Sequence, residues 1–147
     1  MKVAVGGTFE PLHDGHKALL KKAYELGNVL IGLTSDDLAK HSYKEAGPYE
    51  ERKRCMKQYI QGEFNSQANI QKLNEPYGPT ISEHFDYIVV SPETYPVAMK
   101  INLIREDKGL RPIEIVKIDF VLAQDGKPIS STRIKNGEID EHGVLLR

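Results

Sequence analysis

The chain has 147 residues, of which 39% are hydrophobic and 28% are charged, and its net charge at pH 7 is −1. This is the size and composition of one soluble globular domain. No stretch approaches the ~20 consecutive apolar residues of a membrane span, no signal peptide is evident, and neither half is basic enough to indicate nucleic-acid binding. The single cysteine excludes an internal disulfide. We therefore expect a reducing, cytoplasmic environment.

The apolar pattern alternates between strands and helices along the chain. In order, it predicts strand 3–5, helix 15–26, strand 29–34, a short helix from 36, helix 49–59, a weak strand at 70–73, strand 87–90, helix 95–108, strand 114–120 and a short helix at 130–135. This alternation predicts an α/β fold, a Rossmann-like doubly wound parallel sheet with helices on both faces. We expect a single domain over 1–147, with a partly loose tail after about residue 137.

In such a sheet, ligands bind beyond the carboxyl ends of the strands, where the strand order switches. The residues that directly follow predicted strands are small or polar, which is typical of a nucleotide pocket. They are Gly6–Phe9, Thr34–Asp36, Ser91–Thr94 and the stretch leading to Ser130–Thr132.

The segment Gly6–His16 carries the strongest signal for chemistry. Two glycines after a strand let the backbone approach a ligand closely, and the loop then enters a helix N-terminus, which favours anions. His13 and His16 are three residues apart, so both can face one side, and Gly15 removes a side chain between them. The pattern indicates a phosphate site. A plain surface loop, or half a metal site with Asp14, is the alternative.

Two motifs together resemble a known superfamily. Gly-Thr-Phe followed by His-x-Gly-His lies in residues 7–16, and Ile-Ser-Ser-Thr-x-Ile occupies residues 129–134. In this order, these motifs are the signatures of the nucleotidyltransferase superfamily that also contains the class I aminoacyl-tRNA synthetases.

Further segments resemble a narrower group, the phosphopantetheine adenylyltransferases of archaea and the matching domain of the eukaryotic bifunctional CoA synthase. These segments are Gly32–Asp36, Lys40, Pro48–Arg52 and Val90–Tyr95. The resemblance runs from Lys2 to about Gly137. It departs at Pro96, where relatives often carry a basic residue, and His13 stands where the bacterial enzymes usually have Thr.

The resemblance implies a role for each matching residue. His16 would donate to the α-phosphate of ATP, Thr8 would hold the attacking or transferred phosphate, and Lys40 would meet the phosphate of the acceptor; these three are the expected catalytic residues. The expected nucleotide-binding residues are Gly7, Thr8, Phe9, His13, His16, Ser91, Glu93, Arg105, Ser130, Ser131, Thr132 and Arg133. The expected acceptor-binding residues are Thr8, Lys40, Lys44 and Arg52.

Several of these positions have a plain structural alternative. Ser130 can be a simple helix N-cap, and Lys40 can be a solvated loop lysine. Arg52 can belong to an i,i+4 surface pair, and Arg105 can be a surface arginine. His41, His84 and His142 have no partner residues at a functional spacing, so we expect them on the surface. Cys55 falls in the apolar stripe of its predicted helix, so we expect it in the core.

The reaction that the resemblance implies is transfer of AMP from ATP to 4′-phosphopantetheine, giving dephospho-CoA and pyrophosphate in coenzyme A biosynthesis. Mg²⁺ would accompany ATP and keep several waters, so no protein metal ligands are expected. The same motifs serve other acceptors, namely nicotinamide mononucleotide, flavin mononucleotide or an alcohol phosphate with CTP. A non-catalytic nucleotide-sensing module is a further alternative. No nucleic-acid or membrane partner is expected, and the sequence carries no signal for an oligomeric state.

Overall fold

The structure, a computed structural model, describes residues 1–42 and 46–146. Its centre is a five-stranded sheet in the order β3-β2-β1-β4-β5, and every neighbouring pair is parallel. The strands are β1 (Lys2–Gly7), β2 (Asn28–Thr34), β3 (Asn69–Leu73), β4 (Tyr87–Val90) and β5 (Glu114–Lys117). The strand order reverses direction between β1 and β4, which is the switch point of a doubly wound sheet. The predicted fold class is confirmed.

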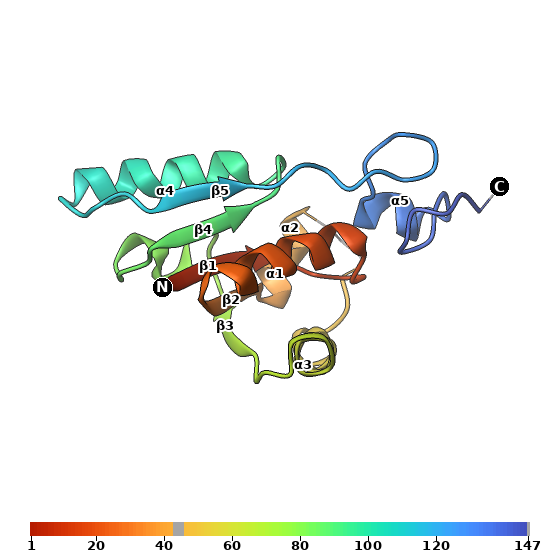
Figure 1. The fold of residues 1–147 in the computed structure, drawn as a ribbon, viewed down its shortest axis with the longest axis horizontal. Coiled ribbons are helices and arrows are strands. Elements are labelled where there is room, and N and C mark those ends of the chain that lie inside the picture. Colours follow the sequence, from red (N-terminus) through yellow and green to blue (C-terminus); the bar gives the residue numbers. More distant parts are fainter. Residues whose placement is uncertain (43–45, 147) are drawn as a thin grey trace.

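The helices are α1 (Asp14–Leu26), α2 (Asp36–Ser42), α3 (Tyr49–Phe64), α4 (Tyr95–Asp107) and α5 (Ser131–Lys135), with a short 3₁₀ helix η1 (Gly78–Ile81) before β4. Figure 1 shows α5 and the C-terminal segment at the end of the sheet away from the N-terminus. The elements match those predicted, with shifted ends. The predicted strand 114–120 stops at Lys117, because its neighbour β4 ends at Val90 and offers no further partner.

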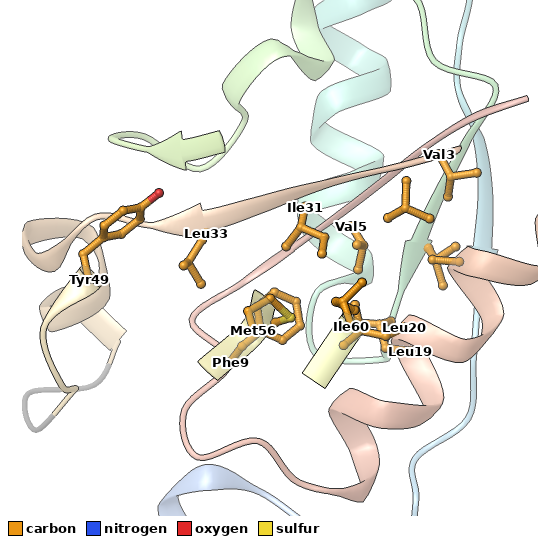
Figure 2. Close-up of a cluster of buried hydrophobic side chains, with 13 residues drawn as sticks. Val3, Val5, Phe9, Leu19, Leu20, Ile31, Leu33, Tyr49, Met56 and Ile60 are labelled. Atoms are coloured by element: carbon orange, nitrogen blue, oxygen red, sulfur yellow. The ribbon is translucent and has the colours of Figure 1, made fainter. Parts of the chain in front are cut away.

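Two hydrophobic clusters cover the two faces of the sheet. One joins β1 and β2 to α1 and α3, and it includes Val5, Leu20, Ile31 and Met56, all of which are fully buried (Figure 2). The other packs α4 against the opposite face through Ala98 and Ile101. Helices thus lie on both faces, as the alternating pattern predicts.

The predicted core position of Cys55 is wrong, because the thiol is exposed. The buried stripe of α3 runs through Arg52, Met56 and Ile60, which are four residues apart. Cys55 is offset by one residue from this stripe, about 100° around the helix, and so faces solvent.

The segment after residue 137 packs back on the molecule. Ile139 is fully buried in a third small cluster with Ala123 and Ile129. A bridge joins Ile139 to Leu145, and the backbone N–H of Asp14 donates to the carbonyl of Glu141 at 3.0 Å. The tail, expected to be partly loose, therefore folds on itself through this bridge and contacts the start of α1 through Glu141 and His142, while Val144, Leu145 and Leu146 are exposed.

Candidate active site at the switch point

A cavity of about 670 Å³ opens at the carboxyl ends of the strands, around the switch point between β1 and β4. The loop after β1, the end of β2, the turn after β4 and the start of α5 all contribute to its wall. Predicted site residues that line it are Gly7, Thr8, Phe9, His13, His16, Ser91, Glu93, Ser130, Ser131 and Thr132. Two motifs more than a hundred residues apart in sequence are thus brought to one cavity.

The two histidines cap the helix that they open. His13 is the N-cap of α1, and its Nδ1 accepts from the N–H groups of Gly15 (3.0 Å) and His16 (3.3 Å). The Nδ1 of His16 accepts in return from the N–H of His13 at 3.4 Å. A neutral imidazole that accepts at Nδ1 carries its proton on Nε2. The cap therefore places the proton of each ring on Nε2, and in His16 this N–H donates to the carbonyl of Pro11.

Burial keeps both rings neutral. Desolvation lowers the pKa of His13 from 6.5 to about 4, although the nearby charge of Asp14 opposes the shift. The pKa of His16 falls to about 3, first through desolvation and then through His13, against a hydrogen bond with the backbone of Pro11. The two rings stack with centroids 3.7 Å apart, a geometry that two imidazolium cations would disfavour. At neutral pH the pair is a set of neutral donors.

Gly15 is required by this cap. A Cβ at this position would lie 2.8 Å from Cε1 and 3.0 Å from Nδ1 of His13. Any side chain would push the imidazole out of its capping position. The prediction that Gly15 clears space between the histidines agrees with this geometry.

The peptide at Phe9 has a left-handed backbone, with φ of 54°, a conformation that is uncommon outside glycine. The Phe9 ring is buried in the cluster with Met56 and Ile60 (Figure 2). It also meets the His16 ring edge to face at 5.1 Å. Core packing thus holds the loop in a sparsely populated conformation next to the cavity, as is common at functional sites.

The second motif forms the start of α5. Ser130 is the N-cap, and its Oγ accepts from the N–H of Arg133 at 3.2 Å. The side chain of Arg133 forms ion pairs with Asp125 and Glu138 and donates to the carbonyl of Pro128. It is not among the residues that line the cavity, because two carboxylates hold it on the other side of the turn.

Arg105, an expected nucleotide-binding residue with a surface arginine as the alternative, lies behind the wall of the cavity, and its burial contradicts the surface alternative. The side chain is buried and does not line the cavity. It donates to the carbonyls of Arg111 (2.6 Å), Thr80 (2.7 Å) and Glu83 (2.8 Å). Burial lowers its pKa from the ordinary value. Arg105 therefore fastens η1 to α4 and holds the wall of the cavity from behind.

The expected acceptor residues are distributed differently from the prediction. Lys40 is exposed on α2 and is not among the lining residues; His41 is also exposed, as predicted, and in addition lines the cavity. His41 follows the lining residue Leu38 by three positions, so both share one helix face. Lys44 lies outside the described residues. The role of Lys40 stays a prediction.

Arg52 is buried behind the loop of Thr8 and does not line the cavity. Its guanidinium donates to the carbonyl of Gly47 (2.8 Å), to Oγ1 of Thr34 (3.2 Å) and to the carboxylate of Asp36 (3.2 Å). Its burial contradicts the alternative of an exposed helix pair, and the acceptor-binding role stays a prediction.

A second part of the wall was absent from the prediction. Residues of β3, of the segment after it and of η1 line one side of the cavity. The lining residues in this part are Gln71, Leu73, Pro76, Tyr77, Pro79 and Thr80. The sequence feature that could have predicted this part of the wall is its position directly after the weak strand 70–73, since ligands bind beyond the carboxyl ends of strands.

Among residues 1–42 and 46–146, no three His, Cys, Asp or Glu side chains come together as a metal-binding group. Asp14, the third member of the alternative metal set, instead pairs with His142 at 2.9 Å. No helix in the described part of the chain is long and apolar enough to cross a membrane.

Comparison with known proteins agrees with this site. Residues 4–137 match the model of the cytidylyltransferase-like family. A phosphopantetheine adenylyltransferase of Methanosarcina barkeri is 55% identical over 151 residues, which cover 99% of this chain and 93% of that protein. The one of Archaeoglobus fulgidus is 50% identical over 148 residues, covering 99% of this chain and 100% of that protein.

A crystal structure from Archaeoglobus fulgidus, described as a protein of unknown function, superposes with a TM-score of 0.79 at 47% identity. The superposition covers 81% of this chain and 90% of that chain. The chain belongs to the cytidylyltransferase-like family and, within it, to the group of the archaeal phosphopantetheine adenylyltransferases.

Proposed function

We propose that this chain transfers the adenylyl group of ATP to 4′-phosphopantetheine, forming dephospho-CoA and pyrophosphate in coenzyme A biosynthesis. The observation that carries the proposal is the similarity over 99% of the chain to proteins named for this activity. The meeting of both motifs in one cavity at the switch point supports it.

The reaction needs no nucleophile from the protein. An anionic oxygen of the acceptor's phosphate attacks Pα of ATP and forms a new O–P bond. The bond between Pα and the oxygen that bridges to Pβ breaks, and pyrophosphate leaves with the electron pair. Because the attacking oxygen is already ionised, no general base is required, and catalysis consists of positioning and charge stabilisation.

The neutral histidines supply donors for this charge. His16 donates its Nε2–H to the α-phosphate, in place of the carbonyl of Pro11, as negative charge develops, and His13 lies closer to the β- and γ-phosphates. Thr8 binds the acceptor's phosphate through its hydroxyl, and the N–H groups of the Phe9 loop add further donors. Neutral donors suit this task because they need no proton change during the step.

The start of α5 receives the leaving group. The N–H groups of Ser131 and Thr132 lie at a helix N-terminus, where backbone donors and the dipole favour an anion. Mg²⁺ would enter with ATP as part of the substrate, where it would neutralise phosphate charge and keep several waters rather than take protein ligands.

The apolar side of the cavity suits the pantetheine arm. Leu73, Tyr77 and Pro79 line it, and they offer a surface for a flexible chain of methylene, methyl and amide groups. Acceptors that carry a second nucleotide base would place a large aromatic ring there instead. Lys40, at the C-terminal end of α2, is the candidate cation for the acceptor's phosphate.

The direct test measures pyrophosphate release from ATP and Mg²⁺ with 4′-phosphopantetheine. Parallel reactions contain nicotinamide mononucleotide, flavin mononucleotide, or CTP with an alcohol phosphate. We expect release with 4′-phosphopantetheine alone. Release with another acceptor keeps the chemistry and discards the proposed substrate. ATP binding without release in any reaction would support the sensing module in place of an enzyme.

A further inference from the structure

The hydroxyl of Thr8 is the end of a chain of hydrogen bonds that begins at a buried cation. The side chain of Arg52 is 1% exposed, and its Nη1 donates to Oγ1 of Thr34 at 3.2 Å. Oγ1 of Thr34 in turn lies 2.9 Å from Oγ1 of Thr8. The three side chains therefore connect the interior behind the loop to the wall of the cavity.

The first link of this chain has a fixed direction. A guanidinium has only donors, so Thr34 must accept from Arg52. A hydroxyl that accepts from a cation is polarised towards donating its own hydrogen onward, because hydrogen bonds in series strengthen one another. In the arrangement that this polarisation favours, Thr34 donates to Thr8, and the hydrogen of the Thr8 hydroxyl points elsewhere. The cavity, which Thr8 lines, is the direction in which a ligand can accept it.

Arg52 also acts on the backbone of the same loop. Its Nη1 contacts the carbonyl of Thr8 at 3.4 Å, and its Nε donates to Gly47 at 2.8 Å. In a trans peptide the C=O and N–H groups point in opposite directions. A Thr8 carbonyl directed towards Arg52 therefore directs the N–H of Phe9 away from it.

We propose that Arg52 and Thr34 are positioning residues that turn the Thr8 hydroxyl into a donor for the acceptor's phosphate. The inference rests on the proposed function, since it concerns the phosphate of 4′-phosphopantetheine. Asp36 completes the arrangement: it pairs with Arg52 at 3.2 Å and accepts from the N–H of Tyr49 at 2.8 Å. This holds the guanidinium in place from the start of α3.

The test uses substitutions that change one group of the chain at a time. Thr34→Val keeps the shape and removes the hydroxyl, and Thr34→Ser restores the hydroxyl as the matched control. We expect Thr34→Val to lower kcat/KM for 4′-phosphopantetheine roughly tenfold, as loss of a hydrogen bond to a charged group does. Thr34→Ser should stay within about threefold of wild type. The Kd for ATP should not change in either variant.

A double-mutant cycle separates positioning from a direct contact, because Thr34 itself lines the cavity. If Thr34 acts through Thr8, then Thr34→Val has no further effect once Thr8→Val has removed the second hydroxyl. Arg52→Lys keeps the charge but loses the forked donor geometry, and we expect it to reproduce the loss of Thr34→Val. Should Arg52→Lys not fold, the Thr34 variants decide by themselves.

Every protein is assayed for pyrophosphate release and for the Kd of 4′-phosphopantetheine, at a temperature where thermal unfolding shows it to be folded. Loss in Thr34→Val, rescue by Thr34→Ser and no added loss in the Thr8→Val background support the proposal. Wild-type behaviour of Thr34→Val, or additive losses, overturn it. If the wild type binds 4′-phosphopantetheine but releases no pyrophosphate, the proposed function fails. The Kd for 4′-phosphopantetheine then tests the positioning role by itself: it should rise in Thr34→Val, recover in Thr34→Ser and show no added rise in the Thr8→Val background. A wild type that does not bind this acceptor overturns both.

Discussion

His13 and His16 illustrate how the state of a single residue is set by its backbone. Each ring accepts a backbone N–H at Nδ1, and burial lowers both pKa values well below neutrality. The cap thus determines the tautomer, and burial determines the charge. A pair of imidazoles in this position is suited to donating hydrogen bonds to phosphate oxygens and unsuited to acting as a cationic clamp.

His16→Ala is expected to lower kcat by roughly 10²–10³, because it removes one donor to the charge that develops in the transition state. The Kd for ATP should change little. Single-turnover kinetics and equilibrium binding of ATP measure the two quantities separately. If ATP binding vanished while the rate per bound ATP remained normal, His16 would be a ground-state binding residue.

His13→Asn is expected to make stability less dependent on pH. In wild type the unfolded chain takes up a proton near pH 6.5, whereas folded His13 resists protonation until pH is about 4. The contribution of neutral His13 to the free energy of unfolding is therefore complete above pH 6.5 and is lost as pH falls towards 4. Asn also caps helices well and does not titrate.

Urea unfolding at pH 7 and at pH 5 checks this prediction. Between these values the wild type should lose more stability than His13→Asn, by an amount on the order of 1–2 kcal/mol. Equal losses in both proteins would mean that His13 is already protonated in the folded state.

At the scale of elements, α4 and η1 act as one wall. Arg105 on α4 donates to two carbonyls of the η1 region. Asn102 on the same helix exchanges two hydrogen bonds of 2.8 Å with the backbone of Ile113, before β5. Both side chains thus join elements to one another.

Arg105→Met is expected to destabilise the protein by roughly 2–4 kcal/mol, because it leaves buried carbonyls without donors. ATP should bind to the folded fraction with an unchanged Kd. Chemical unfolding and calorimetric titration of ATP measure both effects, with Lys100→Met on the exposed side of α4 as the matched control. A large change in the Kd for ATP at unchanged stability would show that Arg105 binds the nucleotide.

At the scale of the whole molecule, the site is closed by a cluster outside the two sheet cores. Ile139, Ile129 and Ala123 pack together beyond the carboxyl ends of the strands, beside the turn of Ser130. Contacts from Glu141 and His142 to Asp14 connect this region to the start of α1. The two motifs are therefore held together partly by the tail of the chain.

Ile139→Ala is expected to cost about 2–4 kcal/mol in this cluster, as a deletion of buried methyl groups does. Because the cluster supports Ser130, the KM for ATP should rise while the sheet cores remain folded. Hydrogen exchange locates the loss, and Val144→Ala at an exposed position of the tail serves as the control. An unchanged KM with exchange increased across the whole sheet would show that Ile139 belongs to the global core.

The features of this fold that depend on neighbouring residues in the sequence could be predicted. The alternation of apolar runs, glycine stops and polar caps depends on near neighbours, so the helices and strands and the doubly wound class followed from the sequence. Ser130 could be expected as an N-cap for the same reason, whereas the capping role of His13 was not predicted. Cys55 was misplaced because its burial depends on a one-residue offset in the stripe of α3.

The sequence by itself thus determined the class of fold, the order of elements and the two motif segments that line the cavity. Only the tertiary structure decided what the long charged side chains do. Arg52, Arg105 and Arg133 each find carbonyls or carboxylates contributed by other segments. Such partners are chosen by the approach of elements distant in sequence, so the residue type and its local spacing do not reveal whether a guanidinium meets a ligand or fastens the protein.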